Sequence, residues 1–271
     1  RDLRGISFLR GDVKSLPRPE AGFDYVIHGA SAIVEPGTPN ADELIADTIL
    51  AGARQILEFS VAAGARRLLY ISSGAVYGPQ PPELEAIPET WLDSPNCLPP
   101  ATAYGRSKLQ AERLCREAAA RKGFELVIAR PFTFAGPYIP LNLNFAFGNF
   151  INDAVHGREI VVNGDGTAVR SYMYMADLAS WLLALLARGI SGEAYNVGSD
   201  HPLTIRQLAE AIAGHASIKI TVKIMKKPGL PHTTNRYIPS VLKTENLGLP
   251  MRSNLNRLIL KTYKWASNHG Y

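Results

Sequence analysis

LLYISSGAVYGP, at residues 68–79, is the stretch that decides the fold, together with AYGRSKL at residues 103–109. Residues 68–71 form an apolar run short enough for a buried strand, and the small residues after it are typical of a loop. A helix is predicted from residue 103 to about 122. In that helix Tyr104 and Lys108 lie on one face, one turn apart. The loop after the strand can bring Ser73 to the same place, at the strand's carboxyl end, where ligands bind in open α/β sheets.

A Tyr-x-x-x-Lys pair is a weak signal alone, because a chain with 11 Tyr contains such pairs by chance. The order of features is more specific: an apolar strand, Ser-Ser, Val-Tyr-Gly, Glu89, Pro100 and then Tyr104-Gly-Arg-Ser-Lys108. This order resembles the extended short-chain dehydrogenase/reductase family, whose nucleotide-sugar epimerases and dehydratases carry a Ser/Thr, Tyr and Lys constellation. The resemblance runs through nearly all of the 271 residues.

The resemblance implies an α/β fold, with a Rossmann-type doubly wound parallel sheet and a smaller C-terminal substrate domain. The dinucleotide-binding domain is expected over residues 1–138, with residues 176–202 returning to it. The nucleotide-sugar-binding domain is expected over residues 139–175 and 203–271.

The start of the chain departs from the family pattern. The family begins with a strand and a Gly-x-x-Gly-x-x-Gly turn that binds the cofactor pyrophosphate, and no such motif occurs in this sequence. Residues 5–13 instead resemble the family's third strand, followed by its adenine-contacting Asp at Asp12. We therefore expect the first two strands of the sheet to be missing from this sequence and the protein to be longer. An intact mass close to 29.5 kDa would contradict that expectation.

The composition is that of an ordinary soluble globule, with 46% hydrophobic and 20% charged residues. The net charge of +5 is mild, and no basic run with interleaved aromatic residues suggests a nucleic-acid partner. Two Cys are too few for a disulfide framework, and no Cys/His cluster has metal-binding spacing. The longest apolar run is too short to cross a membrane. Together these features predict a cytoplasmic protein with no metal and no membrane partner.

The strand at residues 23–28 ends in the small-residue turn Gly29-Ala30-Ser31, where a cofactor can approach the backbone. An ordinary strand-to-helix turn explains these residues almost as well. The resemblance implies NAD as the cofactor, with NADP still open because the residue that separates them comes after the missing second strand. Its remaining expected contacts are Asp12, Val13, Ile71, Tyr104, Lys108 and Pro131.

The substrate implied by the resemblance is a nucleotide-diphosphate sugar. Its expected contacts are Ser73, Thr133, Asn144, Arg170 and Arg236. Thr133 stands where the family often has Asn, which weakens the transfer of that role. Arg170 comes after a Gly-Asp-Gly turn, and such an Arg is usually a surface charge, but a guanidinium can also bind phosphate oxygens bidentately.

A second helix is predicted to begin at a cap formed by Asn40 and Glu43 and to end at Gly64. Its apolar residues recur every three or four positions. The family commonly forms homodimers in which this helix, near residues 41–63, and the helix near residues 102–122 pair with their counterparts in the second copy. A face that packs on the sheet explains the pattern equally well.

The expected catalytic residues are Ser73, Tyr104 and Lys108. Tyr104 would be the general base that takes the proton of the sugar hydroxyl. Free Tyr has a pKa near ~10, so this role needs a shift of about 3 units, or ~4 kcal/mol. Lys108 and the positive nicotinamide ring can stabilise the phenolate by that order, and Ser73 would orient the same sugar oxygen.

Family members differ in the step that comes after oxidation. The 4,6-dehydratases carry an Asp-Glu acid–base pair directly after the catalytic Thr, and the decarboxylases use a Glu there. This chain has Gly74 and Ala75 at those positions, which cannot move protons. We therefore expect an NAD-dependent epimerase acting at C4, with an NAD(P)H-dependent reductase of 4-keto-6-deoxy sugar nucleotides as the alternative. A dehydratase is less favoured, and a non-enzymatic sensor would predict a broken Ser-Tyr-Lys constellation.

Overall fold

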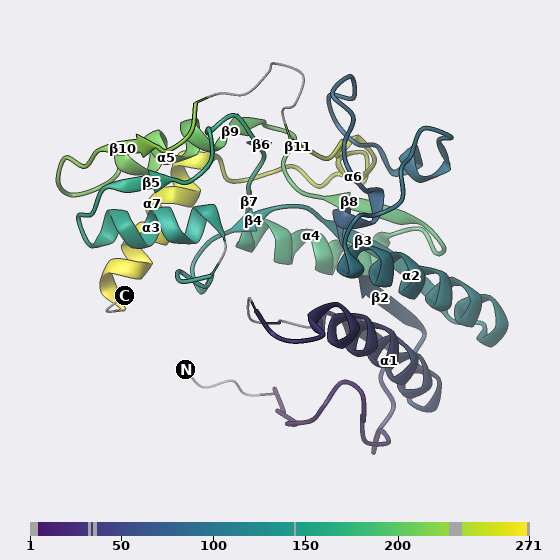
Figure 1. Ribbon diagram of the computed structural model, residues 1–271. Helices are drawn as coiled ribbons and strands as arrows, with labels where there is room; N and C mark the ends of the chain where they lie inside the picture. Colours follow the sequence, from purple (N-terminus) through teal and green to yellow (C-terminus); the bar gives the residue numbers. More distant parts are fainter. Residues whose placement is uncertain (1–4, 32–33, 35–36, 144, 228–234, 270–271) are drawn as a thin grey trace.

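A computed structural model describes residues 5–31, 34, 37–143, 145–227 and 235–269 (Figure 1). Its centre is a four-stranded parallel sheet in the order β1-β2-β3-β8. These strands are β1 (Tyr25–His28), β2 (Arg67–Ile71), β3 (Glu125–Pro131) and β8 (Ala194–Val197). Helices connect the strands, as parallel pairing requires. The predicted fold class, an α/β fold with a Rossmann-type parallel sheet, is confirmed.

Helices cover both faces of this sheet. Leu68 and Tyr70 of β2 pack under α1 (Ala41–Ala62) and α2 (Ala103–Lys122), whereas Leu69 packs against α4 (Met175–Arg188). Alternate side chains of a strand point to opposite faces, so a strand covered on both sides needs a continuous apolar run. The run at residues 68–71 is explained in this way. We call the sheet and these three helices the sheet lobe.

The first helix begins where expected, but not by the expected cap. Asn40 has a φ of 55° and its side chain makes no cap hydrogen bond, so the predicted cap is wrong. Asp42 and Glu43 lie in the first turn instead, where negative charge interacts favourably with the helix dipole. The predicted end at Gly64 is confirmed, since its φ of +66° is the left-handed conformation that glycine adopts most readily.

The rest of the chain forms smaller strand pairs and a second group of helices. The short strands are β4 (Phe134–Ala135), β5 (Ile160–Val162), β6 (Val169–Arg170), β7 (Met173–Tyr174), β9 (Leu203–Thr204), β10 (Val222–Ile224) and β11 (Arg236–Tyr237). The remaining helices are α3 (Ala146–Val155), α5 (Ile205–Ala213), α6 (Leu242–Glu245) and α7 (Leu255–Asn268), with single 3₁₀ turns η1 (Gly74–Tyr77) and η2 (Glu89–Asp93). β4 pairs with β7 and β5 with β10, while β6 lies between β9 and β11.

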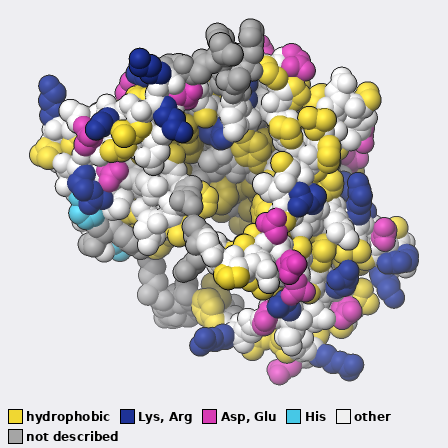
Figure 2. Space-filling view, in the orientation of Figure 1, with side chains coloured by type: hydrophobic (Ala, Val, Ile, Leu, Met, Phe, Trp, Pro, Cys, Tyr) yellow, Lys and Arg dark blue, Asp and Glu magenta, His cyan; other side chains and the backbone are white. Residues whose placement is uncertain are grey.

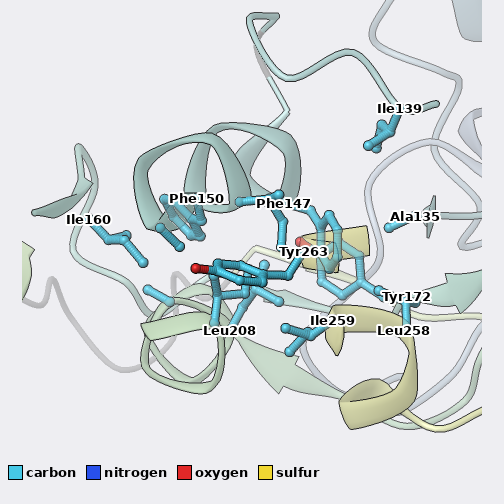
Figure 3. Packing of buried hydrophobic residues seen from close by; sticks show 14 of the residues in the cluster. Ala135, Ile139, Phe147, Phe150, Ile160, Tyr172, Leu208, Leu258, Ile259 and Tyr263 are labelled. Carbon is cyan, nitrogen blue, oxygen red and sulfur yellow. The ribbon is translucent and has the colours of Figure 1, made fainter. Parts of the chain in front are cut away.

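Of these elements, α6 and η2 pack on β8 and η1 packs on α2. A separate hydrophobic core holds α3, α5, α7 and the short strands beside them together (Figure 3). In it Phe147 and Phe150 of α3 meet Leu208 of α5 and the α7 residues Ile259 and Tyr263. We call this group the second lobe. Its core draws on residues 135–174 and 203–266. The division into two domains at the predicted boundaries stays a prediction.

The strand expected over residues 5–13 is absent from the described structure. Residues 5–11 have no regular secondary structure, and Phe8 and Leu9 are 81% and 79% exposed. The prediction for this segment is therefore wrong in this structure. The physical reason is pairing: a strand needs hydrogen bonds from a neighbour, and within the described residues β1 pairs only with β2.

The surface carries no concentration of positive charge on the face drawn in Figure 2, where Lys and Arg side chains are scattered over both lobes. The same view shows this face hollowed between the lobes, with hydrophobic side chains in the hollow. Among the described helices none is long and apolar enough to span a bilayer. Nor does the described part of the chain group three His, Cys, Asp or Glu side chains as metal ligands.

Candidate active site

Ser73 stands at the carboxyl end of β2, where the chain turns from strand to 3₁₀ helix. It has extended backbone geometry and caps η1, since its Oγ accepts a hydrogen bond from the Ala75 N–H at 3.2 Å. The preceding turn is fixed to the sheet, because the Ser72 N–H donates to the Ala129 carbonyl at 2.7 Å. Ser73 is 9% exposed. A strand followed by Ser-Ser and small residues therefore places a hydroxyl at the edge of the sheet where ligands bind.

Tyr104 and Lys108 come to this edge from the first turns of α2. Thr102 caps the helix by accepting the Gly105 N–H at 3.1 Å. Lys108 is 2% exposed, and its Nζ lies 5.9 Å from the centre of the Tyr104 ring. The same Nζ donates to the Ile71 carbonyl at 2.9 Å, which links α2 to the last residue of β2. The predicted pair on one helix face is thus present, directly beside the strand end that precedes Ser73.

Burial controls the charges around this pair. It lowers the pKa of Lys108 to about 8, against the opposing effects of Cys115 and Glu112. Burial also lowers the pKa of His28 to about 4, and the charge of Lys108 acts in the same direction. At neutral pH the ammonium is therefore still protonated while the imidazole is neutral. Lys108 supplies the positive charge at this end of the sheet.

The residues expected to contact the cofactor fall into two groups. Gly29, Ala30 and Ser31 are exposed after β1, and a Cβ on Gly29 would come within 3.3 Å of Ile71 Cδ1. This turn therefore lies against the strand end that Lys108 contacts. Pro131 is buried at the end of β3, the next strand of the sheet.

Asp12 and Val13 lie on the other side of β1, beside α1. Val13 packs within 3.3 Å of the position that a Cβ on Gly52 would take, and His28 borders the same position. Asp12 is exposed, and its Oδ1 accepts the Lys14 N–H at 2.9 Å. These contacts tie both residues to the surroundings of α1, and their cofactor role stays a prediction.

The donor set at the sheet edge suits the nicotinamide and ribose end of NAD. An ammonium has three N–H donors, and the described residues give Lys108 Nζ one hydrogen-bond acceptor, the Ile71 carbonyl. Donors left on a buried cation can serve ribose hydroxyl groups. Gly29 presents backbone without a side chain on the same edge, where a planar ring could approach closely.

The two arginines expected to hold phosphate lie on neighbouring strands of the second lobe. In the parallel pair of β11 and β6, Tyr237 is opposite Arg170. The Arg170 Nη1 donates to the carbonyls of Val169 and Asn235 at 2.8 and 2.9 Å, and burial lowers its pKa. Arg236 donates weakly to the Glu85 carbonyl, and its Nε is buried without a partner in the described structure. Neither guanidinium forms an ion pair with a described carboxylate, so both can bind an anion.

The other two expected substrate contacts are Thr133 and Asn144. Thr133 is half-buried between β3 and β4, and its carbonyl accepts the Met173 N–H at 3.1 Å. This bond fixes the backbone at Thr133, and its predicted role toward the substrate stays a prediction. Asn144 lies outside the described residues.

One residue of this site was not found from the sequence. Tyr237, beside Arg236, places its hydroxyl against Gly74, where an added Cβ would lie 2.5 Å from Tyr237 Oη. Its ring stacks on Phe132 with the ring centres 4.5 Å apart. Only its position next to an expected phosphate-binding arginine could have pointed to it, because a two-residue strand gives no periodic signal.

The profile of the NAD dependent epimerase/dehydratase family matches residues 8–198. UDP-glucuronic acid decarboxylase 1 of Danio rerio is 27% identical over 196 residues, which is 70% of this chain and 46% of that protein. The chain spans about half the length of the first curated relatives that it matches.

Solved structures show the same fold. The UDP-glucose 4-epimerase of Thermotoga maritima, solved with UDP-glucose, has a TM-score of 0.77 at 23% identity, covering 92% of this chain and 78% of that one. The RMD protein of Pseudomonas aeruginosa, complexed with NADPH, has a TM-score of 0.81 at 25% identity, covering 96% and 88%.

Proposed function

The chain belongs to the NAD dependent epimerase/dehydratase family, and from this premise we propose that it is a nucleotide-sugar epimerase that acts by transient oxidation at sugar C4. Two contacts support the proposal: the Lys108 ammonium lies 5.9 Å from the centre of the Tyr104 ring, and it bonds to the carbonyl of Ile71, two residues before Ser73. Tyr104, Lys108 and Ser73 are then the general base, the cation and the orienting donor that oxidation of an alcohol requires.

In the proposed reaction the chain's own residues bind the sugar and move one proton. Tyr104, as the phenolate that the Lys108 ammonium stabilises, takes the proton of the C4 hydroxyl at Oη and becomes neutral. Ser73 donates a hydrogen bond to the same oxygen and keeps it in line. NAD, held beside Lys108 and the turn at Gly29, would supply the hydride acceptor and donor for this reaction. Because an epimerase returns the hydride to the opposite face, it needs no further acid–base pair.

The residues after Ser73 distinguish this reaction from others in the family. Gly74 and Ala75 have no titratable side chain, so elimination of water or loss of carbon dioxide lacks the acid and base that relatives place there. The similarity to the Danio rerio decarboxylase therefore supports membership of the family, but it does not support decarboxylation as the reaction of this chain.

The alternative is an NAD(P)H-dependent reductase of 4-keto-6-deoxy sugar nucleotides, which uses the same three groups. It is favoured by the likeness to the Pseudomonas aeruginosa protein complexed with NADPH. The two reactions differ in whether the dinucleotide stays bound through each turnover.

The test uses the full-length purified protein. Its bound nucleotide is released and identified by mass and absorbance, and UDP- and dTDP-hexoses are then monitored by NMR for inversion at C4. Retained NAD together with inversion is the expected result. An empty site that binds NADPH on addition would support the reductase, and a protein that binds no dinucleotide would contradict both proposals.

We also propose the predicted homodimer through α1 and α2. The apolar residues Ile49 and Ile56 of α1 are buried in the core of the sheet lobe, so their spacing is accounted for by packing within one chain. Leu44 and Val61 of the same helix are 46% and 45% exposed and could face a second copy. Sedimentation of wild type and of Leu44→Glu would test this: the variant should shift toward the monomer.

A further inference from the structure

The Lys108 ammonium lies against a second tyrosine besides Tyr104. Its Nζ lies over the Tyr70 ring, 5.3 Å from the ring centre, and 5.9 Å from the centre of the Tyr104 ring. Both distances are within the ~6 Å at which a cation is attracted by the face of an aromatic ring. Tyr104 is the proposed general base, whereas Tyr70 has no part so far in the proposed reaction.

The position of Tyr70 is fixed by the central sheet. It lies in the middle of three strands, opposite His28 of β1 and Ile128 of β3, and its side chain is fully buried under α1 and α2. The next residue, Ile71, supplies the carbonyl that accepts the hydrogen bond of Lys108 Nζ at 2.9 Å. Two consecutive residues of β2 thus give the ammonium an aromatic face and a carbonyl oxygen.

The ring of Tyr70, and not its hydroxyl, makes this contact. The hydroxyl is buried and has no hydrogen-bond partner within the described residues. Such a group costs free energy, because it has lost water without gaining a partner. The face of the ring carries the partial negative charge that attracts a cation. A phenylalanine at the same place would therefore offer Lys108 the same face.

Three other titratable groups act on the ammonium, and none of them pairs with it. Both oxygens of Glu112 are bound by the guanidinium of Arg130, at 2.9 and 2.7 Å. Burial raises the pKa of Cys115 to about 12 and lowers the pKa of His28 to about 4, so both groups are neutral at pH 7. Within the described residues Lys108 is therefore held by two ring faces and one carbonyl oxygen.

We propose that Tyr70 is a positioning residue: the face of its ring holds the Lys108 ammonium beside Tyr104 and keeps it protonated there. Its effect on turnover rests on the proposed function, in which Lys108 stabilises the Tyr104 phenolate. The contact between the ring and the ammonium does not depend on a substrate. Because Tyr70 is fully buried, it acts through Lys108 and not on the sugar itself.

The first test changes the charge distribution of the ring and keeps its shape. Incorporation of pentafluorophenylalanine at position 70 of the full-length protein reverses the quadrupole of the ring. It should lower the pKa of Lys108 by about one unit, because a desolvated cation–π contact favours the protonated form tenfold or more. Tyr70→Phe keeps the aromatic face and should leave this pKa as in wild type. NMR of the lysine Nζ signals measures the pKa, with Lys108→Arg as the assignment control.

The second test follows turnover, with C4 inversion as the assay. Tyr70→Met removes the ring and should move the alkaline fall of kcat about one pH unit lower, so that kcat at pH 8 drops about fivefold while KM changes less than about twofold. Phe124→Met is the matched control, because Phe124 belongs to the same hydrophobic core and has no cation over its ring in the described structure. It should lose stability and keep the wild-type pH profile. Equal shifts in the two variants would overturn the proposal.

The NMR measurement separates this inference from the proposed function. If wild type inverts no nucleotide sugar, the proposed function fails, and the pKa of Lys108 still tests the contact with Tyr70. A fall of about one unit on fluorination, absent in Tyr70→Phe, would support the contact. An unchanged pKa on fluorination would overturn it, and so would an equal fall in Tyr70→Phe, which would assign the effect to the hydroxyl. A lowered pKa with the alkaline fall of kcat unmoved would overturn the role in turnover.

Discussion

Two buried cations lie along the same side of the sheet, and their surroundings differ sharply. Lys108 on α2 has one hydrogen-bond acceptor in the described structure, the Ile71 carbonyl. Arg130 on β3 is bound through both Nε and Nη2 to the two oxygens of Glu112, at 2.9 and 2.7 Å, and its Nη1 donates to Tyr77 Oη at 2.8 Å. Glu112 stands only one turn after Lys108, yet it pairs with the arginine.

The arginine side continues as a closed network. Tyr77 Oη donates to Asn196 Oδ1 at 2.7 Å, and Asn196 Nδ2 donates to the carbonyls of Ile87 and Ser240. We call this set the scaffold network. A buried polar network with all its members satisfied is rigid and specifies one arrangement, whereas a buried cation with spare donors is available to a ligand. The difference separates a group that holds the fold from one that we propose to take part in the reaction.

The largest effect that we expect is at Tyr104, beside Lys108, where we propose that the reaction takes place. Tyr104→Phe should lower kcat about a thousandfold, since general acid–base catalysis contributes ~10²–10⁴-fold. Because Tyr104 is only half-buried, the free energy of unfolding should change little. Kinetics and urea unfolding measured side by side check both, with the exposed Tyr25→Phe as control. Unchanged function in Tyr104→Phe would point to a binding protein, not an enzyme.

A substitution in the scaffold network should instead act mainly on the free energy of unfolding. Arg130→Met leaves Glu112 buried and unpaired, which costs about 3–5 kcal/mol of unfolding free energy. The surface pair of Arg66 and Asp24, 3.8 Å apart with side chains 74% and 70% exposed, provides the control. Arg66→Met should change stability by about 0.5 kcal/mol or less. If the two losses were similar, burial would not be what distinguishes the scaffold network.

A pH dependence should distinguish Lys108 from ordinary lysines. Its pKa is lowered to about 8 by burial, from a usual value of 10.5. Between about pH 8 and pH 10.5 the Lys108 side chain keeps its proton in the unfolded chain but has lost it in the folded chain. The free energy of unfolding contributed by this residue therefore rises with pH. Relative to Lys108→Met, wild type should gain roughly 3 kcal/mol between pH 7.5 and 10.5. Urea unfolding at the two pH values measures the difference, and parallel curves would contradict it.

The smallest effect concerns the proposed phosphate contacts. Arg170→Met should raise KM about tenfold and change kcat less than about twofold, because the guanidinium would bind the substrate away from the reacting carbon. Arg158→Met is the matched control, since Arg158 lies in the second lobe and pairs with Asp153 at 3.0 Å. A loss of kcat at unchanged KM in Arg170→Met would instead place Arg170 among the residues that take part in the chemical step.

Much of the sheet lobe could be predicted because its signals are local. The buried strand at residues 68–71 and the helix after residue 102 can be derived from short-range patterns, and Tyr104 and Lys108 are brought together by helix geometry alone. The segment at residues 5–11 has the same kind of pattern and was predicted wrongly. Pattern alone cannot supply the neighbouring strand that its hydrogen bonds would need.

The contacts that could not be predicted join distant parts of the chain. Arg130 and Glu112 are on different elements, and their pairing depends on how α2 packs on β3. Tyr237 meets Gly74 only because β11 pairs with β6 and Gln80 holds the next residue, Ile238. Such contacts arise from packing, which residue types along one segment do not encode.

The pairing of β11 with β6 has a consequence for the size of the substrate that we propose. Tyr237 Oη lies against Gly74, the residue after Ser73, and the Tyr237 backbone stands opposite Arg170, so one aromatic side chain lies between the proposed orienting residue and the proposed phosphate-binding residue. The strand pair thus sets a fixed distance between these two residues. A hexose 1-phosphate, which lacks the second phosphate, would fall short of it, and a comparison of its turnover with that of the nucleoside diphosphate hexose would measure that reach.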